Sequence, residues 1–190
     1  MLKNYKANIP LHKDSGQKAA LTCERERYEA KEEKLTSMIR LFRKTDLTPL
    51  HRMIYDTIEA SYSNVYPPRA VEFFKEYHSE KKIAERSLVG EILVMEEDDS
   101  ILATGSLIGA EIAGVFVYPV YQRQGYGKAI MAELERRAKA KGLSEINLSV
   151  SLPSRKFYEN LGYNILADNA LDVGEGQYLK YWLGRKTLSS

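Results

Sequence analysis

The chain has 190 residues, with one cysteine, three histidines and a formal net charge of +2. One cysteine excludes an intramolecular disulfide and any Cys-rich metal module, and the histidines stand far apart, so no metal is expected. The small net charge gives no reason to expect a nucleic-acid partner. No apolar run approaches the roughly 18 residues of a membrane helix, and the start lacks the apolar stretch of a secretory signal. We therefore expect no membrane partner and a cytoplasmic location.

The first 35 residues are predicted to form an extension, partly helical or flexible, that precedes the domain proper. Residues 1–16 mix polar residues with Pro10 and Gly16 and are typical of irregular structure. Residues 17–34 are rich in Ala, Glu, Lys and Arg, which favours a helix, although their apolar positions form only a weak stripe. Such a segment is either a solvated appendage or a dimerisation or lid helix. The domain is expected to span residues 36–190.

The first half of this domain predicts one strand and two helices. Residues 38–42 are predicted to form a strand. Asp46 or Thr48 can cap a helix that has Pro49 in its first turn and continues with helical spacing through Ile58. Pro67-Pro68 begins a second helix, expected to run to about residue 80. In that helix Val71 and Phe74 are expected to face inward.

Three strands are predicted next, at 92–95, 101–108 and 111–117. Glu-Asp-Asp-Ser at 97–100 makes the turn between the first two, so the three strands are expected to form an antiparallel meander. Pro119 closes the third strand.

The pattern becomes helical after Gly125. Ile130, Met131, Leu134 and Ala138 share one face, and Gly142 is typical of a helix end. The pairs Glu133–Arg137 and Glu135–Lys139 are expected to support its solvent side. The chain then predicts a strand at 146–150, a short helix at about 153–161, and strands near 163–166 and 177–183. This order of strands and helices indicates an α+β fold with a mixed sheet.

The most informative segment is Gln122-Arg123-Gln124-Gly125-Tyr126-Gly127-Lys128, where a buried strand turns into a long helix. The first helical turn has backbone N–H groups without partners, and the helix dipole adds positive potential there. Glycines remove the side chains that would keep a phosphate from these donors. Arg123 and Lys128 add full positive charge. The segment therefore predicts a diphosphate site.

Two other phosphate motifs do not fit this segment. A Walker loop requires Ser or Thr after Gly-Lys, but Ala129 follows Gly127-Lys128. A dinucleotide fingerprint would need Gly or Ala in place of Ile130, and it normally opens the first βαβ unit of a domain.

The segment instead matches Q/R-x-x-G-x-G/A, the cofactor signature of the GCN5-related N-acetyltransferase (GNAT) superfamily. Val117-x-Pro119 lies at the expected distance before it. Phe157-Tyr158-Glu159-Asn160-Leu161-Gly162-Tyr163 resembles the family's F-Y-E-x-L-G-F/Y about thirty residues later. The resemblance covers roughly residues 38–183 and is strongest over 111–163, so the extension lies outside it.

The resemblance implies a central mixed, mostly antiparallel sheet flanked by helices, with two splayed parallel strands that form the coenzyme A cleft. Acetyl-CoA is then the cosubstrate, and no metal is involved. The splayed strands would be 111–117 and 146–150. Backbone groups of the first strand would bind the pantetheine and acetyl groups, and the amides of residues 123–128 would bind the pyrophosphate. Ser151 stands where an Asn is common in the family. The cofactor-binding residues so implied are Val115, Phe116, Val117, Gln122, Arg123, Gln124, Gly125, Tyr126, Gly127, Lys128 and Ser151.

The resemblance also implies two catalytic groups. Tyr158 stands where many family members place a tyrosine that protonates the departing thiolate; otherwise it is a half-buried helix tyrosine. Glu111 stands eleven residues before Gln122, the spacing of the general base in the histone-acetyltransferase branch; otherwise it is an exposed turn residue, and water is the base. Ser149 replaces the glutamate that serves as base in relatives that acetylate ribosomal proteins.

Acetyl transfer to a primary amine of a small molecule is the function that the sequence favours. It leaves open a protein or peptide acceptor, and also a non-catalytic acyl-CoA-binding regulatory module. Helices at 48–62 and 67–80 are expected to form the wall of the acceptor pocket. The sequence is also compatible with a homodimer, because dimers through sheet edges are frequent in the family. The side chains expected near that pocket are Tyr55, Glu59, Tyr62, Tyr66, Glu72 and His78.

Overall fold

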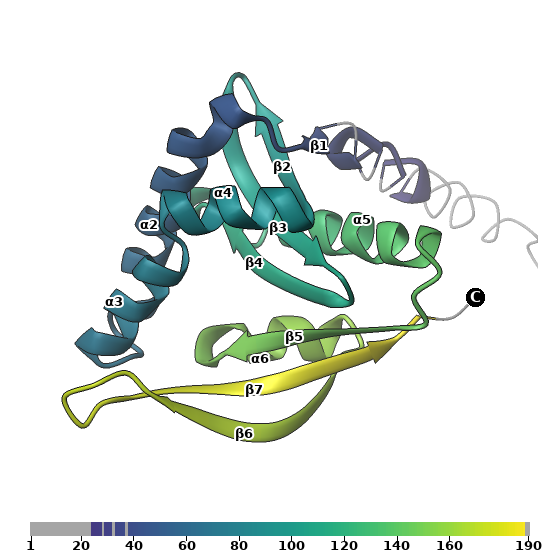
Figure 1. Ribbon diagram of the computed structural model, residues 1–190. Helices are drawn as coiled ribbons and strands as arrows, with labels where there is room; N and C mark the ends of the chain where they lie inside the picture. The colour runs from purple at the N-terminus through teal and green to yellow at the C-terminus, as the bar shows by residue number, and fades with distance from the viewer. Residues whose placement is uncertain (1–23, 28, 32, 37, 189–190) are drawn as a thin grey trace, which may run out of the picture. The chain divides into compact units, whose positions relative to one another are not determined.

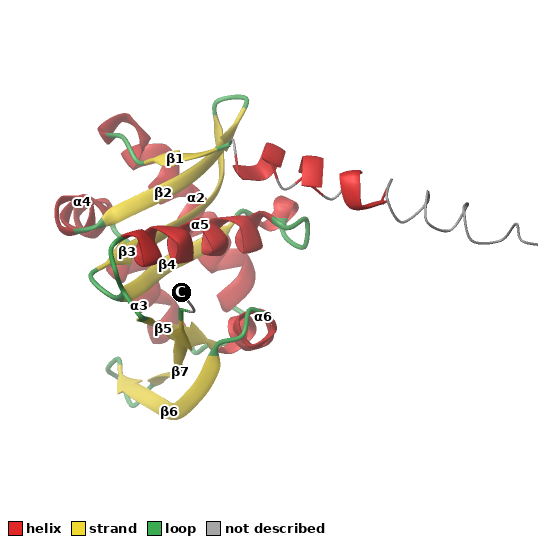
Figure 2. Ribbon diagram, turned by 90° about the vertical axis from the view of Figure 1, so that its right-hand side faces the viewer, coloured by secondary structure: helices red, strands yellow, loops and turns green. Residues whose placement is uncertain are grey.

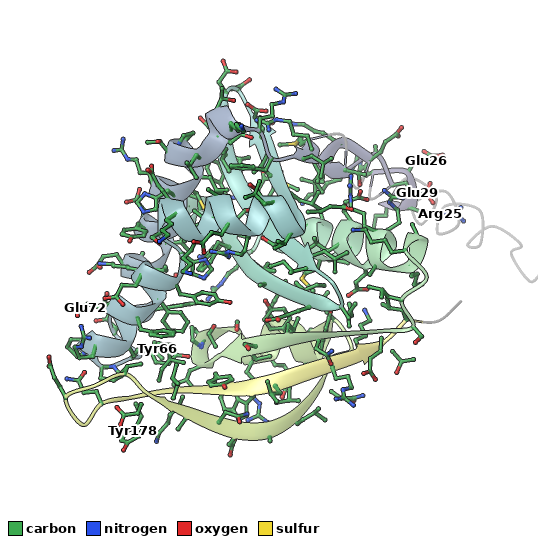
Figure 3. The ribbon with its side chains drawn as sticks, viewed as in Figure 1. Arg25, Glu26, Glu29, Tyr66, Glu72 and Tyr178 are labelled. Carbon is green, nitrogen blue, oxygen red and sulfur yellow. The ribbon has the colours of Figure 1, made fainter. Side chains whose placement is uncertain are left out.

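The computed structural model describes residues 24–188, except 28, 32 and 37. Contacts divide the chain into two units, Met1–Leu35 and Thr36–Ser190. The described residues of the first unit are helical and charged. Arg25 Nε donates a hydrogen bond to Glu29 Oε1 at 2.7 Å, and both side chains, labelled in Figure 3, are exposed. The irregular segment expected at 1–16 lies outside the described residues.

The second unit is built on a seven-stranded sheet (Figure 1), which confirms the predicted fold class. The strand order is β1-β2-β3-β4-β5-β7-β6, and all neighbours are antiparallel except β4 and β5, which are parallel. The strands are β1 (Ile39–Leu41), β2 (Glu91–Glu97), β3 (Ser100–Ile108), β4 (Glu111–Val117), β5 (Glu145–Ser151), β6 (Asn164–Asp172) and β7 (Tyr178–Thr187). The last two strands are longer than predicted.

Helices cover both faces of the β2–β4 part of the sheet (Figures 1 and 2). Helix α5 lies on one face, and α2 and α4 lie on the other. The helices are α2 (Leu47–Tyr62), α3 (Pro68–Tyr77), α4 (Glu80–Val89), α5 (Tyr126–Ala140) and α6 (Arg155–Asn160). Among the described residues, none of the helices has the length and apolarity needed to cross a bilayer.

The core lies between the sheet and these helices. Ile130, Met131, Leu134 and Ala138 of α5 are completely buried, as the helical pattern predicted. From the other side, α2 contributes Leu50, Met53, Ile54 and Ile58. Burying each large aliphatic side chain stabilises a fold by roughly 1.5–3 kcal/mol. The two apolar helix faces therefore hold α2 and α5 against the sheet. This packing fixes the positions of the helix ends.

Helix α4 was not predicted, so the expected order of elements was one helix short. Its sequence has a weak apolar face because Ile83 is its only buried residue, while Leu88 and Val89 are exposed. Ser79 precedes the helix and Gly90 follows it, and these were the available boundary signals.

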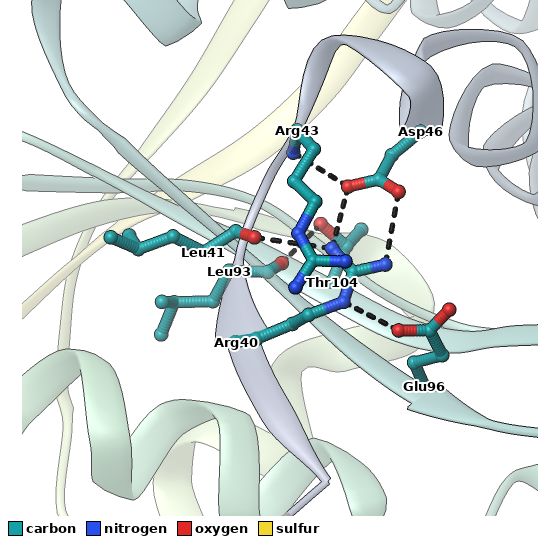
Figure 4. Close-up of polar contacts among 7 residues, drawn as sticks. All are labelled: Arg40, Leu41, Arg43, Asp46, Leu93, Glu96 and Thr104. Carbon is teal, nitrogen blue, oxygen red and sulfur yellow. Dashed lines mark hydrogen bonds and ion pairs between the residues drawn. The ribbon is translucent and has the colours of Figure 1, made fainter.

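Of the two predicted caps, Thr48 lies inside α2, and Asp46 occupies the N-cap position but its side chain makes no capping hydrogen bond there. Its carboxylate accepts two hydrogen bonds from the Arg40 guanidinium, at 2.7 and 2.9 Å, and one from Arg43 N at 2.6 Å (Figure 4). Arg40 Nε also donates to Glu96 Oε2 at 2.5 Å. This network ties β1 and β2 to the start of α2. Burial raises the pKa of Asp46, but the Arg40 and Arg43 hydrogen bonds outweigh it, so the pKa is lowered.

The two ion pairs predicted along α5 differ in outcome. Glu133 pairs with Arg137 at 2.7 Å as expected. Glu135 does not pair with Lys139: its carboxylate binds Lys186 Nζ at 2.7 Å and accepts a hydrogen bond from Tyr163 Oη at 3.1 Å. Glu135 therefore joins α5 to the last strand, a long-range contact that local spacing could not reveal.

Strands β4 and β5 separate soon after they begin. They pair at Glu111 with Asn147 and at Ile112 with Leu148 only, whereas β5 continues to pair with β7 as far as Ser151. A bulge interrupts the pairing of β3 with β4, and there Gly114 has a φ of +61°. The rest of β4 therefore presents its backbone to an opening on the β5 side.

Candidate active site

Two cavities meet where β4 and β5 separate. The larger has a volume of about 510 Å³ and the smaller about 280 Å³. Six of the described residues line both cavities, so the two cavities are adjacent and share one wall. These shared residues are Tyr62, Val115, Phe116, Ser151, Ser154 and Tyr158.

The larger cavity reaches the start of α5. Gly125, with a φ of +100°, precedes the helix, and Arg123 also has a positive φ, of 61°. A side chain at Gly125 would be strained at this φ, so glycine is the residue that allows the turn. The amides of the first helical turn have no acceptor within the helix. Five residues of the predicted loop line this cavity: Gln122, Arg123, Gly125, Gly127 and Lys128.

Two side chains of the predicted cofactor loop do not line the cavity. Gln124 Nε2 donates to Val120 O at 3.1 Å, and the Tyr126 ring packs edge-on against Tyr121, with 5.9 Å between ring centroids. The side chains of Gln124 and Tyr126 therefore support the loop, and only their backbone groups remain as candidate cofactor contacts.

The residues of β4 that follow the split, Val115, Phe116 and Val117, line the larger cavity. Gln122 Nε2 donates to Val117 O at 3.1 Å, so this glutamine fastens the loop to the strand. On the β5 side, these β4 residues have no strand partner. Their backbone can therefore bond an extended polar chain such as pantetheine.

Tyr158 lies on α6 and faces the junction of both cavities. Its side chain is 6% exposed and packs edge-on against Tyr163, with 5.7 Å between ring centroids. Its hydroxyl has no hydrogen-bond partner among the described residues, and the oxygen is not one of the fully enclosed polar atoms, so it is open to the cavities that the ring lines. Burial, and to a lesser degree Tyr62, raise the pKa of Tyr158, so the hydroxyl keeps its proton.

Ser151 takes part in a chain of hydroxyls at the end of β5. Tyr62 Oη donates to Ser151 Oγ at 3.2 Å, and Ser151 Oγ lies 2.8 Å from Ser154 Oγ. Ser154 also bonds Ser151 O at 3.0 Å. The Ser151 hydroxyl thus has two protein partners, in contrast to that of Tyr158.

Glu111 is the first residue of β4, and its side chain is exposed. It lines the smaller cavity together with Ser149. Glu111 is therefore an exposed residue after a turn, as one interpretation expected, and it also lines a cavity. Its role as a base stays a prediction.

Aromatic rings form a large part of the wall of the smaller cavity. Of the six side chains expected near the acceptor, Tyr62 and His78 line it. The other four do not: Tyr55 Oη bonds Lys75 O, Glu59 pairs with Lys75, Glu72 pairs with Arg69, and Tyr66 lies buried against β7 (Figure 3). The aromatic rings of the wall belong to Tyr62, Phe73, Phe74, Tyr77, His78, Phe116, Tyr158 and Tyr181.

Several cavity residues were not found by sequence reasoning. Thr57 and Ser61 of α2 line the larger cavity, and Phe157 lies beside Tyr158. Thr57 and Ser61 stand four residues apart, so two small polar residues beside the apolar face of α2 were their available signal. Among the described residues, no three His, Cys, Asp or Glu side chains gather closely enough to hold a metal ion.

Comparison with known proteins identifies the family of this site. The model of the acetyltransferase (GNAT) domain matches residues 62–174, more than half of the chain. An uncharacterized acetyltransferase of Streptococcus pyogenes serotype M3 is 26% identical over an alignment of 87 residues, gaps included, that covers 43% of this chain and 61% of that relative. The chain therefore spans less than two thirds of that relative's length.

Two solved structures share the fold. One is a GCN5-related N-acetyltransferase from Rhodopseudomonas palustris, with a TM-score of 0.73 at 22% identity, covering 79% of this chain and 94% of that one. The other is the PaiA N-acetyltransferase of Thermoplasma acidophilum in complex with coenzyme A, with a TM-score of 0.65 at 21% identity, covering 78% and 97%. With the family match and the split between β4 and β5, they lead to one conclusion: the chain belongs to the GNAT acetyltransferase family.

Proposed function

We propose that this protein transfers the acetyl group of acetyl-CoA to a primary amine of a small molecule. The observation that carries the proposal is the meeting of the two cavities at Tyr158, whose ring is buried and whose hydroxyl, open to the cavities, has no partner among the described residues. One cavity reaches the loop and helix start suited to a diphosphate, and the other ends among aromatic rings. The structure from Thermoplasma acidophilum, which shares the fold, is a complex with coenzyme A, and this supports acetyl-CoA as the cosubstrate.

In this proposal coenzyme A lies along β4. The amides from Arg123 to Lys128 bind its pyrophosphate, and the backbone of Val115 to Val117 binds pantetheine and the thioester carbonyl. The smaller cavity, of about 280 Å³, holds the amine. Ser151, bonded to Tyr62 and Ser154, shapes the wall between them.

The chemistry needs a neutral amine and a proton for the thiolate. The amine nitrogen attacks the thioester carbon, a C–N bond forms, and the C–S bond breaks. Glu111, directly or through water, takes the proton from the nitrogen. Tyr158 gives its hydroxyl proton to the departing sulfur, and bulk solvent restores it. No metal is needed in this scheme.

A thiol-release screen tests the proposal. Purified protein with acetyl-CoA is offered polyamines, aminoglycosides, amino acids and peptides, and each product is identified by mass. Release of coenzyme A together with an acetylated small amine supports the proposal. If acetylation occurs only on peptides, the acceptor class is wrong. If coenzyme A binds saturably but no acceptor in the panel is acetylated, the alternative of a non-catalytic acyl-CoA-binding module replaces it.

The division of labour along the chain is also a proposal. We take residues 36–190 as the acetyltransferase domain and residues 1–35 as an extension that is not needed for acetyl transfer. A chain that begins at residue 36 should therefore keep its kcat and its KM for acetyl-CoA. A large loss of either value, with the shortened chain still folded, would give the extension a part in the site.

A further inference from the structure

His78 stands at one corner of the smaller cavity, between α3 and α4. Its ring is 4% exposed and meets the Phe116 ring at 89°, with 4.9 Å between centroids. Arg86 of α4 lies behind it, with Arg86 Nη2 3.0 Å from His78 Nδ1. His78 thus has a protein partner on one nitrogen and the cavity in front of it.

The contact with Arg86 determines which nitrogen of His78 carries the proton. A guanidinium has donors and no acceptor, so His78 Nδ1 must accept and be unprotonated. The proton of the neutral ring is therefore on Nε2, which has no hydrogen-bond partner among the described residues. Burial, followed by the nearby Arg86 charge, lowers the pKa of His78 well below its ordinary value, so the ring stays neutral. His78 therefore offers one N–H donor and is not a base.

Arg86 brings a positive charge that no carboxylate balances among the described residues. Nη2 also donates to Tyr77 O at 3.0 Å and Nε donates to Lys82 O at 3.2 Å, but these acceptors are backbone carbonyls. Six other arginines in the described part of this unit pair with Asp or Glu, as Arg40 and Arg137 do. A half-buried arginine without such a partner leaves a positive potential at this corner.

Gly114 allows β4 to approach this pair closely. A Cβ built on Gly114 would lie 3.0 Å from Arg86 Nη1 and 3.3 Å from His78 Cε1. The bulge with its φ of +61° therefore brings the bare backbone of β4 against both side chains. Val115, the next residue, lines both cavities, so this corner lies next to the place proposed for the thioester.

We propose that His78 and Arg86 bind a carboxylate of the acceptor, so that the preferred acceptor is a primary amine that also carries a carboxylate, as an amino acid does. His78 Nε2–H donates to one oxygen, and the Arg86 charge favours the anion from behind the ring. Glu111 lines this cavity three residues before Gly114 on the same strand, so a zwitterion would meet a carboxylate on one side and, behind His78, the charge of Arg86 on the other. This inference rests on the proposed acetyl transfer and names its acceptor class.

Matched sets of three acceptors test the inference. Each set contains an amino acid, its amide and the amine without the carboxyl carbon, for example leucine, leucinamide and 3-methylbutylamine, or phenylalanine, phenylalaninamide and phenethylamine. The amide keeps an oxygen for His78 but has no charge for Arg86. Because the three amines differ in basicity, kcat/KM is expressed per concentration of neutral amine. We expect the carboxylate to exceed the plain amine by about 10- to 100-fold, with the amide between them.

Variants assign the preference to the two residues. His78→Phe removes the donor and should make kcat/KM nearly equal for the three acceptors. His78→Gln keeps an N–H donor and should retain part of the preference for the carboxylate and the amide over the plain amine. Arg86→Gln should remove the advantage of the carboxylate over the amide but leave that of the amide over the plain amine. Arg86→Lys keeps the charge and should restore part of the carboxylate preference. Arg136→Gln, which removes an arginine on α5 outside both cavities, should change none of the ratios.

The ratio of two acceptors within one variant does not depend on how much of the protein is folded, so a loss of stability cannot imitate the result. Equal efficiencies for the three acceptors with the unaltered protein would overturn the carboxylate site and leave acetyl transfer standing. So would a preference that survives both His78→Phe and Arg86→Gln. If no amine in these sets or in the wider panel is acetylated, the proposed function itself fails.

Discussion

Tyr62 Oη donates a hydrogen bond to Ser151 Oγ at 3.2 Å and so joins the last turn of α2 to the end of β5. The two residues stand 89 positions apart in the chain, and both line both cavities. Tyr158 lies in the same shared wall, but its hydroxyl has no such partner among the described residues. The two tyrosines are therefore a matched pair in which one hydroxyl supports the wall and the other is available to a reactant.

Tyr158→Phe keeps the ring and its packing but removes the proposed proton donor. Free thiols have a pKa near 8.5, so a thiolate leaves fairly readily, and the low end of the usual range for general acid catalysis is expected. We expect kcat to fall by about 10- to 1000-fold, with little change in acetyl-CoA affinity. The control is Tyr62→Phe, which loses a structural hydrogen bond and should lower kcat by much less. If both variants lose the same factor, or if Tyr158→Phe keeps kcat within about twofold, Tyr158 has only a packing role.

Gly125→Leu should prevent acetyl-CoA binding, because the added side chain would occupy the place proposed for the pyrophosphate. Acetyl-CoA at about 100 times its Kd should stabilise the unaltered protein by roughly 2.7 kcal/mol, measured as a shift in Tm, and NADH or ATP should do much less. Gly142→Leu is the matched control, since Gly142 also has a positive φ, of 76°, and ends the same helix with open space around it. It should lower Tm but keep the acetyl-CoA shift. If acetyl-CoA shifted the Tm of Gly125→Leu as much as that of the unaltered protein, the cofactor would not bind at this loop.

Glu111→Gln tests the base through the pH dependence of the rate. Where the acceptor amine is mostly protonated, at acidic to neutral pH, the carboxylate is expected to matter most. At high pH the neutral amine is abundant, and the difference between the variant and the unaltered protein should narrow. The measurement is kcat/KM against pH for both. A uniform loss at every pH, or no loss, would transfer the role to water or to another group.

Asp46→Asn should destabilise the fold by about 1.5–3 kcal/mol at neutral pH, because it weakens the hydrogen bonds from Arg40 and Arg43 N to a side chain that is 9% exposed. The pKa of Asp46 is lowered in the folded protein from an ordinary value of 3.8. The stability it contributes is therefore present above about pH 4 and is lost as pH falls through the folded pKa.

Urea unfolding at several pH values checks this expectation. The stability difference between Asp46→Asn and the unaltered protein should be largest at neutral pH and should shrink in acid. Asp56→Asn, at an exposed position on α2, is the control and should change stability by no more than about 0.5 kcal/mol. A difference that stays constant down to acid pH would mean that the charge of Asp46 is not what stabilises this corner.

Local patterns were enough to predict the parts of the fold that are periodic or that turn on glycine. Residues close together in the sequence are enough to predict three features: the apolar face of α5, the alternation of Ile146, Leu148 and Val150 in β5, and the turn at Gly125. Helix α4 was missed because it buries Ile83 alone, so its pattern is close to that of a solvated segment.

Long-range partners explain the remaining errors. Asp is a residue type that often caps helices, but the carboxylate of Asp46 accepts hydrogen bonds from Arg40 of β1 instead. Glu135 has the spacing for Lys139, but Lys186 from β7 reaches it. The corner of the smaller cavity is assembled in the same way: His78 follows α3, Arg86 lies on α4, and Gly114 comes from a bulge in β4. No local pattern predicts that the three meet.

The most direct test of the central claim follows the acetyl group itself. Acetyl-CoA labelled in the acetyl carbons is incubated with the protein and a panel of primary amines, and the label is located by mass spectrometry. We predict that it moves to the amine nitrogen as coenzyme A is released in equal amount, and that Tyr158→Phe slows this transfer. Label that stays on coenzyme A with every acceptor, while acetyl-CoA binds saturably, would contradict acetyl transfer at the meeting of the two cavities.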